Sequence, residues 1–197
     1  METRFIGCLH LGHEGMARHR GFVDSWAHDD YLIEQWNSVV GKKDIVYILG
    51  DVTMASKKWY FKLDQLNGTK HVVLGNHDRR QDVPELLKYV DTVGGCIDWH
   101  GYMLTHAPVH PNEVTFHKGN IHAHIHHVNK LEEFVVHNRF TDVGSILVPT
   151  KAFYINVDAK LLNFKPRTID ELTYSDDETL KEYERMSSDW NLGKGFL

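Results

Sequence analysis

The sequence predicts an α/β fold in which a parallel sheet is followed by a second sheet of short strands. Over the first 75 residues, apolar β-branched runs alternate with segments of helical spacing, which is typical of βαβ units. From about residue 90 the strand-like runs are shorter and separated by glycines, which favours β-hairpins. At 197 residues the chain has the usual size of one domain. We therefore expect a single domain over 1–197, with a helical tail from about residue 170.

Three apolar runs in the first half of the chain are predicted strands: 3–8, 44–49 and 70–74. A long polar loop is expected after the first of them. Apolar residues at helical spacing predict an amphipathic helix over about 29–40, with Gly41 as its C-cap. A shorter helix is expected after Ser56, whose hydroxyl can cap its first turn. These helices would return the chain to the sheet after each strand.

The second half of the chain is predicted to add a short helix, a second sheet and a tail. The helix is expected around Pro84 and is followed by strand-like runs at 90–93, 97–99, 102–105 and 134–137. The first three of these runs are expected to form hairpins of the second sheet. Two more runs, 152–157 and 161–165, would flank Asp158 as a terminal hairpin. Ser175 and Glu178 form a capping box ahead of a last helix, whereas 127–150 gives a mixed pattern.

Composition and charge exclude several classes of protein. The net charge is −5 and no block of lysines and arginines occurs, so extended nucleic acid is not an expected partner. The two cysteines, Cys8 and Cys96, make no disulfide framework, which fits a reducing compartment. No run approaches the roughly 20 apolar residues of a membrane span, and the first residues lack a signal peptide. We expect a soluble, cytoplasmic protein whose oligomeric state the sequence leaves open.

Polar residues with potential metal-binding atoms end or follow five of the strand-like runs, which is where α/β sheets bind ligands. They are Cys8, His10, Asp51, Asn76, His77, Asp78, His106, His122, His124 and His126. Each has an ordinary alternative: Asp51 could cap a turn, and His106 could be a hydrogen-bonded core histidine. The last three histidines alternate and share one face, as in a plain polar strand. Together, however, the set offers the ligands that two adjacent divalent cations need.

These residues fall into five short motifs in a specific order. The motifs are Cys8-Leu9-His10, Gly50-Asp51, Gly75-Asn76-His77-Asp78, Thr105-His106 and Ala123-His124-Ile125-His126. They resemble the motifs DxH, GD, GNH(D/E), H and GHxH of the calcineurin-like metallophosphoesterases. The resemblance covers roughly residues 3 to 160 and is to short, stand-alone bacterial and phage members. With the strand pattern, it implies a four-layer αββα sandwich of two mixed β-sheets, with metals in the strand-end loops.

The resemblance assigns the ligands to two metal sites. Cys8, His10, Asp51 and His126 would hold one divalent cation, and Asp51, Asn76, His106 and His124 would hold the other. Asp51 would bridge the pair, because a carboxylate can span cations about 3.5 to 4 Å apart. A water or hydroxide between the ions would be the nucleophile, with its pKa lowered towards about 7. The cations expected are two divalent ions of Mn, Zn, Fe or Ni.

Two further motif residues are expected to act in catalysis. His77 would face the phosphoryl group, stabilise charge in the transition state and protonate the leaving oxygen as a general acid. Asp78 would hold the His77 imidazole in the right orientation. His13 and His127 adjoin ligand motifs and are candidates for contact with substrate, since phosphate recognition favours imidazole donors. Both are equally well explained as loop surface.

Two residues depart from the pattern of the family. Ala123 replaces a glycine, a minor change where the backbone conformation is one that alanine adopts. Cys8 replaces an aspartate, and a thiolate favours zinc or iron over magnesium or manganese at the first site. Alternatively, Cys8 is a small buried strand residue, and the remaining ligands hold the first metal weakly.

The predicted function is that of a dinuclear metal-dependent phosphohydrolase. The activity expected first is that of a phosphodiesterase on small or nucleotide-like phosphate esters. One alternative is a phosphomonoesterase, for example a nucleotide phosphatase, because the motifs describe the phosphoryl centre and say little about its substituents. Another is a metal-binding interaction module with weakened catalysis. The presence of His77, the expected acid, favours an enzyme.

Overall fold

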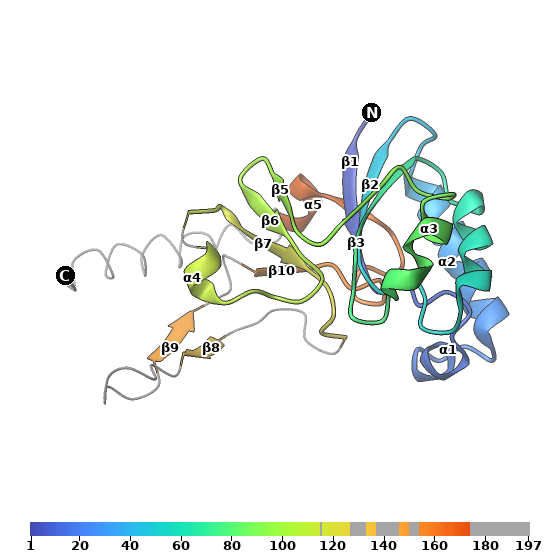
Figure 1. Ribbon diagram of the computed structural model, residues 1–197, viewed down its shortest axis with the longest axis horizontal. Helices are drawn as coiled ribbons and strands as arrows, with labels where there is room; N and C mark the ends of the chain where they lie inside the picture. Colours follow the sequence, from blue (N-terminus) through green and yellow to red (C-terminus); the bar gives the residue numbers. More distant parts are fainter. Residues whose placement is uncertain (115, 127–132, 137–145, 150–153, 174–197) are drawn as a thin grey trace.

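The computed structural model describes residues 1–114, 116–126, 133–136, 146–149 and 154–173 (Figure 1). Two mixed sheets pack together, as the sequence predicts, and helices of the first half of the chain cover the outer face of the first sheet (Figure 1). Among the described helices, none has the length and apolar character needed to cross a bilayer.

The first sheet has the strand order β11-β1-β2-β3-β4. Its strands are β1 (Thr3–Ile6), β2 (Ile45–Leu49), β3 (Thr69–Val73), β4 (Thr92–Gly94) and β11 (Arg167–Thr168). β1 to β4 run parallel, whereas β11 pairs antiparallel with β1. The three strands predicted in the first half are confirmed. The run at 90–93 is corrected: its strand β4 pairs with β3 in the first sheet and not with the second sheet.

The second sheet has the strand order β10-β7-β6-β5. Its strands are β5 (Ile97–Trp99), β6 (Tyr102–Leu104), β7 (Gly119–His122) and β10 (Tyr154–Asn156). β5 and β6 form the predicted hairpin, and β7 pairs in parallel with both β6 and β10. A separate antiparallel pair consists of β8 (Glu133–Val136), which matches the strand predicted at 134–137, and β9 (Ile146–Pro149).

The predicted terminal hairpin is wrong. Its first run forms β10, which pairs with β7, and its second run, 161–165, forms turns. The backbone amide of Phe164 donates to the carbonyl oxygen of Ala159 at 2.7 Å, and Asn163 and Phe164 have positive φ angles that a strand does not allow. The chain then reaches the first sheet as β11.

The helices are α1 (Glu14–His19), α2 (Ser25–Val39), η1 (Lys57–Gln65), η2 (Arg80–Asp82), α3 (Val83–Leu86), α4 (Pro111–Val114) and α5 (Ile169–Thr173). α2 begins earlier than predicted because the Asp24 carboxylate accepts a hydrogen bond of 2.8 Å from the amide of Ala27. α1 lies in the segment predicted as a polar loop. Ser56 caps η1 as predicted. The helix predicted after Ser175 lies outside the described residues.

Two apolar layers hold these elements together. The first lies between the helices and the first sheet, and includes Ile6, Ile48, Val72, Trp36, Leu63 and Leu86. The second lies between the two sheets, and includes Phe5, Leu49, Val73, Leu104 and Ile121. Neighbouring residues of a strand point to opposite faces, so β1, β2 and β3 contribute to both layers. The loops that follow β1 and β2 are anchored in the first layer by Leu9, Leu11 and Val52.

Candidate metal centre

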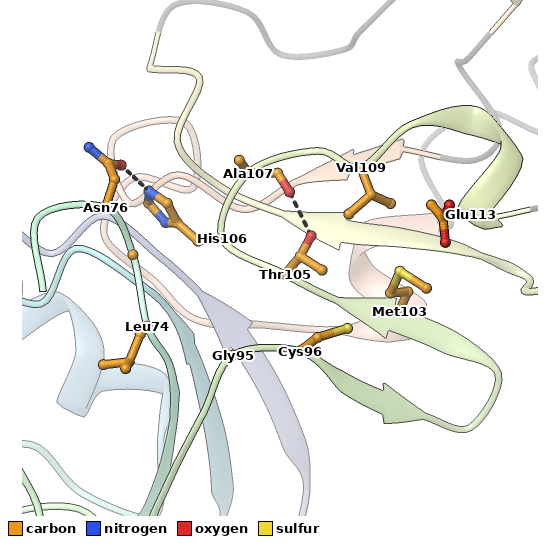
Figure 2. Close-up of a pocket in the computed structure, with 11 residues that line it drawn as sticks. Leu74, Asn76, Gly95, Cys96, Met103, Thr105, His106, Ala107, Val109 and Glu113 are labelled. Carbon is orange, nitrogen blue, oxygen red and sulfur yellow. Dashed lines mark hydrogen bonds between the residues drawn. The ribbon is translucent and has the colours of Figure 1, made fainter. Parts of the chain in front are cut away.

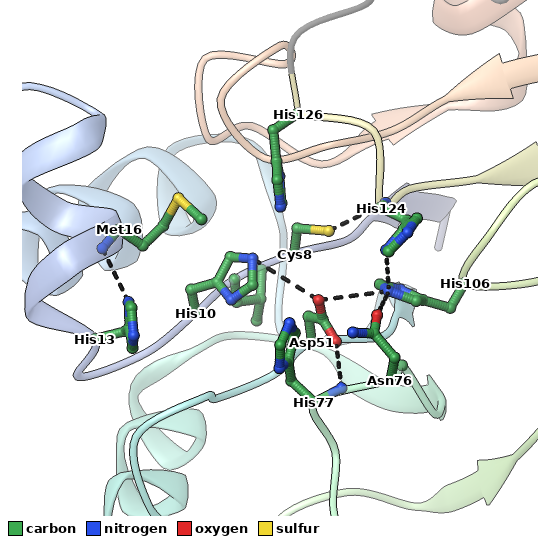
Figure 3. A network of polar contacts seen from close by, with 12 residues as sticks. Cys8, His10, His13, Met16, Asp51, Asn76, His77, His106, His124 and His126 are labelled. Carbon is green, nitrogen blue, oxygen red and sulfur yellow. Dashed lines mark hydrogen bonds and ion pairs between the residues drawn. The ribbon is translucent and has the colours of Figure 1, made fainter.

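Strand ends from both sheets bring the residues predicted as ligands to one site (Figure 3). They follow β1 (Cys8 and His10), β2 (Asp51), β3 (Asn76), β6 (His106) and β7 (His124 and His126). Because β1, β2 and β3 are parallel, as are β6 and β7, their carboxyl ends lie at the same edge of each sheet. The site thus joins the two sheets.

Asp51 lies at the centre of this set. Its Oδ2 is 3.4 Å from Nε2 of His106 and 3.9 Å from Nε2 of His10. Its Oδ1 accepts a hydrogen bond of 3.0 Å from the backbone amide of His77. Burial acts to raise the pKa of Asp51, but the neighbouring His106 imidazole outweighs it and lowers the pKa to about 2. The carboxylate is therefore ionised and lies between two groups of ligands.

The first of these groups contains His106, Asn76 and His124. Nε2 of His106 lies 2.9 Å from Oδ1 of Asn76 and 3.2 Å from Nδ1 of His124. Its Nδ1 lies 2.8 Å from the carbonyl oxygen of Leu49 and donates to it, which directs Nε2 into the centre. Ligand atoms about 2.1 Å from one cation lie about 3 to 3.5 Å apart, so these separations suit a metal site.

The other group contains Cys8, His10 and His126. Their ligand atoms all lie within 4.8 Å of one another, and the rings of His10 and His126 are 5.1 Å apart between centroids. The Cys8 sulfur also lies within 4.8 Å of ligand atoms of Asp51 and His106, so it faces both groups. This position is the one predicted for a first-site ligand.

The Cys8 thiol is fully buried and its sulfur accepts a hydrogen bond of 3.2 Å from the backbone amide of His124. Burial and the nearby Asp158 carboxylate raise the pKa of this thiol well above its usual range. A cation has the opposite effect, because it stabilises the thiolate that coordinates it. The thiol is therefore suited to a ligand role and not to that of a free nucleophile.

Among the residues that the structure describes, three buried atoms of the centre have no hydrogen-bond partner: Nδ1 and Nε2 of His10, and Oδ2 of Asp51. Buried polar atoms are normally hydrogen-bonded, so these atoms require another kind of partner. Burial lowers the pKa of His10 to about 2, which keeps its imidazole neutral. A neutral imidazole and an ionised carboxylate are the forms that coordinate divalent cations. The residues present thus fit two cations that share Asp51.

The backbone of four predicted ligands is left-handed, a conformation that side chains other than glycine rarely adopt. The φ angles are 56° at Cys8, 54° at His10, 53° at Asp51 and 69° at His124. Such residues cost about 1 to 3 kcal/mol each and concentrate at functional sites. Gly50 permits the close approach of the loops, because a Cβ there would overlap the His106 ring and the backbone of Gly75.

Asp78 has contacts that differ from its predicted ones. Its Oδ2 accepts hydrogen bonds of 2.8 Å from the amides of Asp51 and Gly75, and its Oδ1 accepts one of 3.0 Å from the amide of Val52. The carboxylate therefore fixes the loop after β2 against the loop after β3, where the prediction had it orient the imidazole of His77. Burial raises the pKa of Asp78.

His77 and His13 lie beside the ligands. The exposed ring of His77 is 6.3 Å from that of His10, between centroids, and the ring of His13 is 6.4 Å from it. Nδ1 of His13 also accepts a hydrogen bond of 2.9 Å from the amide of Met16 and so caps α1. Burial and His77 lower the pKa of His13. His127 lies outside the described residues, and its contact with substrate stays a prediction.

A buried ionic network that the sequence analysis missed supports the centre. Asp158 accepts from Nδ1 of His126 at 2.7 Å and pairs with Arg20 at 3.5 Å. Arg20 donates to the carbonyl oxygens of Cys8 at 2.7 Å and Leu9 at 3.3 Å. The network therefore fixes both a ligand side chain and the backbone of another ligand.

The same network continues away from the centre. Nη1 of Arg20 lies 3.0 Å from Nε2 of His28, whose Nδ1 lies 2.9 Å from Asp29. Asp29 pairs with Lys62 at 3.2 Å and accepts from the amide of Gly12 at 2.9 Å. Arg20 and Asp158 are 138 positions apart, so no local pattern in the sequence signals that they pair.

Comparisons with known proteins show the family and the fold of the chain. Residues 1–185 match the sequence profile of the family described as calcineurin-like phosphoesterase. The chain is 31% identical over 170 residues to an uncharacterized protein of Methanocaldococcus jannaschii, covering 84% of this chain and 85% of the relative. It is 40% identical over 81 residues to the gene 66 protein of Mycobacterium phage L5, covering 39% of each. A crystal structure of an Aquifex aeolicus protein of unknown function shares the fold, with a TM-score of 0.61 at 22% identity over 86% of this chain and 96% of that one.

Proposed function

Because the chain belongs to the calcineurin-like phosphoesterase family and is a metal-dependent phosphoric-ester hydrolase, we propose that it is a dinuclear phosphodiesterase. Its proposed substrates are diesters of small or nucleotide-like organic groups. One observation carries the dinuclear part. Where the two ligand groups meet, buried atoms of His10 and Asp51 have no hydrogen-bond partner among the described residues. The centre would hold one cation on each side of Asp51.

The cations would supply Lewis acidity towards the phosphoryl oxygens and a water whose pKa is lowered enough to act as the nucleophile. His77 is proposed as the general acid. Its backbone amide is anchored on Asp51, and its exposed ring lies beside the ligands, so it can give a proton to the leaving oxygen. Asp78 supports this role indirectly, because it holds together the two loops that carry Asp51 and His77.

A diester is favoured over a monoester because of the space beside the centre. Asn76 and His106 line a pocket of about 630 Å³ next to the ligands. A diester has two organic groups and a single negative charge, so one group can enter this pocket while the phosphate lies on the ligands. Cys8 further favours Zn or Fe on the side of His10 and His126.

The proposal is tested by hydrolysis of bis-p-nitrophenyl phosphate beside p-nitrophenyl phosphate. Metal-stripped protein is resupplied separately with Mn²⁺, Zn²⁺, Fe²⁺, Ni²⁺ and Mg²⁺. We expect faster turnover of the diester, dependent on metal and lost by about 100-fold or more in His77→Ala. His19→Ala, which removes an exposed histidine of α1, is the matched control. A folded, metal-loaded protein that hydrolyses neither ester would overturn the proposal and favour an interaction module.

A further inference from the structure

The pocket beside the centre has a composition that selects among phosphodiesters. It opens between the loop after β3, the segment joining β4 to β5, and the segment from β6 to α4. In Figure 2, Asn76 and His106 lie at one end of it and Glu113 at the other. The end that carries the two proposed ligands therefore adjoins the position of a bound phosphate.

The side chains along the pocket are mainly apolar. Met103 and Val109 contribute carbon and sulfur atoms, and the exposed Cys96 also lines the pocket. Among the described residues that line the pocket, neither lysine nor arginine occurs, and the carboxyl of Glu113 is the single charge. A second anionic group would meet this carboxylate with no cation to offset it.

Away from Asn76 and His106, which are proposed to bind metal, the polar side chains that line the pocket are those of Thr105 and Glu113. The Thr105 hydroxyl donates to the carbonyl oxygen of Ala107 at 2.7 Å and accepts from the Asn120 side chain at 2.9 Å (Figure 2). The Thr105 hydroxyl therefore has little capacity left to bind a polar ligand, whereas the apolar side chains can exclude water around an apolar one.

We propose that this pocket binds an uncharged, apolar organic group of the substrate, such as an aryl ring, while the phosphate lies on the metal ligands. The inference rests on the proposed function and adds the class of ester. The volume of about 630 Å³ is within the range of pockets that hold small organic ligands. A diester with an aryl group is therefore preferred over one with a methyl group or an anionic group.

Cys96 provides a direct readout of the pocket, because Cys8 is fully buried and Cys96 is exposed. Metal-loaded protein is alkylated with iodoacetamide, and modification of the Cys96 peptide is followed by mass spectrometry. The probes are diphenylphosphinate and dimethylphosphinate, monoanions that contain no ester bond. We expect diphenylphosphinate to slow alkylation about tenfold at saturation and dimethylphosphinate to leave it within about twofold. Equal rates with both probes would overturn the inference.

Kinetics separate this inference from the proposed function. We expect kcat/KM for p-nitrophenyl phenyl phosphate to exceed that for p-nitrophenyl methyl phosphate by about tenfold or more. Cys96→Trp, which adds a ring to the lining of the pocket, is expected to remove this preference. Leu87→Trp, which adds the same ring at the exposed residue that follows α3, is expected to keep it. Turnover of both esters at equal rates would contradict the inference and leave the proposed function intact. If neither ester is hydrolysed, both the inference and the proposed function are contradicted.

Discussion

Cys8 is the residue on which the metal preference of the centre depends. Its buried sulfur faces both ligand groups, and sulfur is a softer ligand than the carboxylate that the family places there. Cys8→Asp would put a harder ligand at the same left-handed position, which aspartate tolerates better than most residues. We expect the ratio of activity with Mn²⁺ to activity with Zn²⁺ to rise about tenfold or more.

Metal content and activity of Cys8→Asp are measured after loading with each ion separately. Val23→Asp, which adds the same side chain at a position that is 78% exposed, is the control. If Cys8→Asp keeps the metal profile of the natural protein, Cys8 is a buried residue with no part in metal binding, and the remaining ligands hold the first cation.

Asp158 is expected to act on both the stability and the metal affinity of the protein. It is the partner of His126 and of the buried Arg20, so Asp158→Asn leaves a guanidinium without its counter-charge. Arg20 keeps its carbonyl partners, and we expect a loss of about 2 to 3 kcal/mol of stability, below the usual cost of breaking a buried pair. Affinity for the first cation should fall by roughly 10- to 100-fold.

Urea unfolding of the metal-free protein and calorimetric titration with Zn²⁺ measure these two effects. The exposed Asp170→Asn is the control, expected to stay within about 0.5 kcal/mol of the natural protein. A variant with unchanged stability and unchanged affinity would show that the ionic network does not support the centre.

The sequence contained more information about the ligands than about the residues that position them. Strand-end placement and motif order predict His10, Asp51 and Asn76 as ligands, because each follows a recognisable apolar run. Asp158 also follows a predicted apolar run, 152–157, but its partners His126 and Arg20 are far from it in the sequence. Pairs of this kind form only when the sheets pack, so a local pattern cannot reveal them.

Strands and helices were predicted correctly where the local pattern of apolar residues determines the element. The predictions were wrong where strand pairing determines which sheet a segment joins. β1, β2 and β3 each end in apolar residues that are buried on both faces of the sheet, and these residues give a clear strand signal. β4 has the same local character as β5, and only its pairing with β3 assigns it to the first sheet. α1 has six residues and a histidine cap, which gives a weak periodic signal.

The two sheets meet closely where β1 and β7 end. A Cβ at Gly7 would overlap the methyl of Ala123, the residue that replaces the glycine of the family motif, and would lie 2.8 Å from the carbonyl oxygen of Leu49. Ala123 has no left-handed backbone, which agrees with its predicted tolerance. The absence of a side chain at Gly7 therefore provides the space that Ala123 occupies.

Gly7→Ala is expected to destabilise the protein by about 1 to 3 kcal/mol through overpacking. Ala123→Gly in the same chain should restore part of this loss, with a coupling of about 1 kcal/mol, because the contact with Leu49 remains. Urea unfolding of the natural protein, both single variants and the double variant measures this coupling. A value near zero would mean that the backbone relaxes and that the two residues do not compete for space.

For the molecule as a whole, the centre is a link between two sheets that otherwise meet through an apolar layer. His10, Asp51 and Asn76 come from the first sheet, and His106 and His126 from the second. A cation with ligands from both sheets stabilises only the folded arrangement, because the unfolded chain does not bring these residues together. Metal binding should therefore raise the stability of the entire domain.

Removal of metal is expected to lower the melting temperature by about 5 to 10 °C. A ligand at 100 times its Kd stabilises the native state by about 2.7 kcal/mol. In a chain of this length, each kcal/mol of stability shifts the melting temperature by about 2 to 4 °C. Thermal unfolding is compared with saturating Zn²⁺ and with excess EDTA. In Asp51→Asn the shared carboxylate is lost, and we expect the response to EDTA to disappear. A natural protein that melts equally with and without metal would show that the buried ligands of the two sheets are not joined through cations.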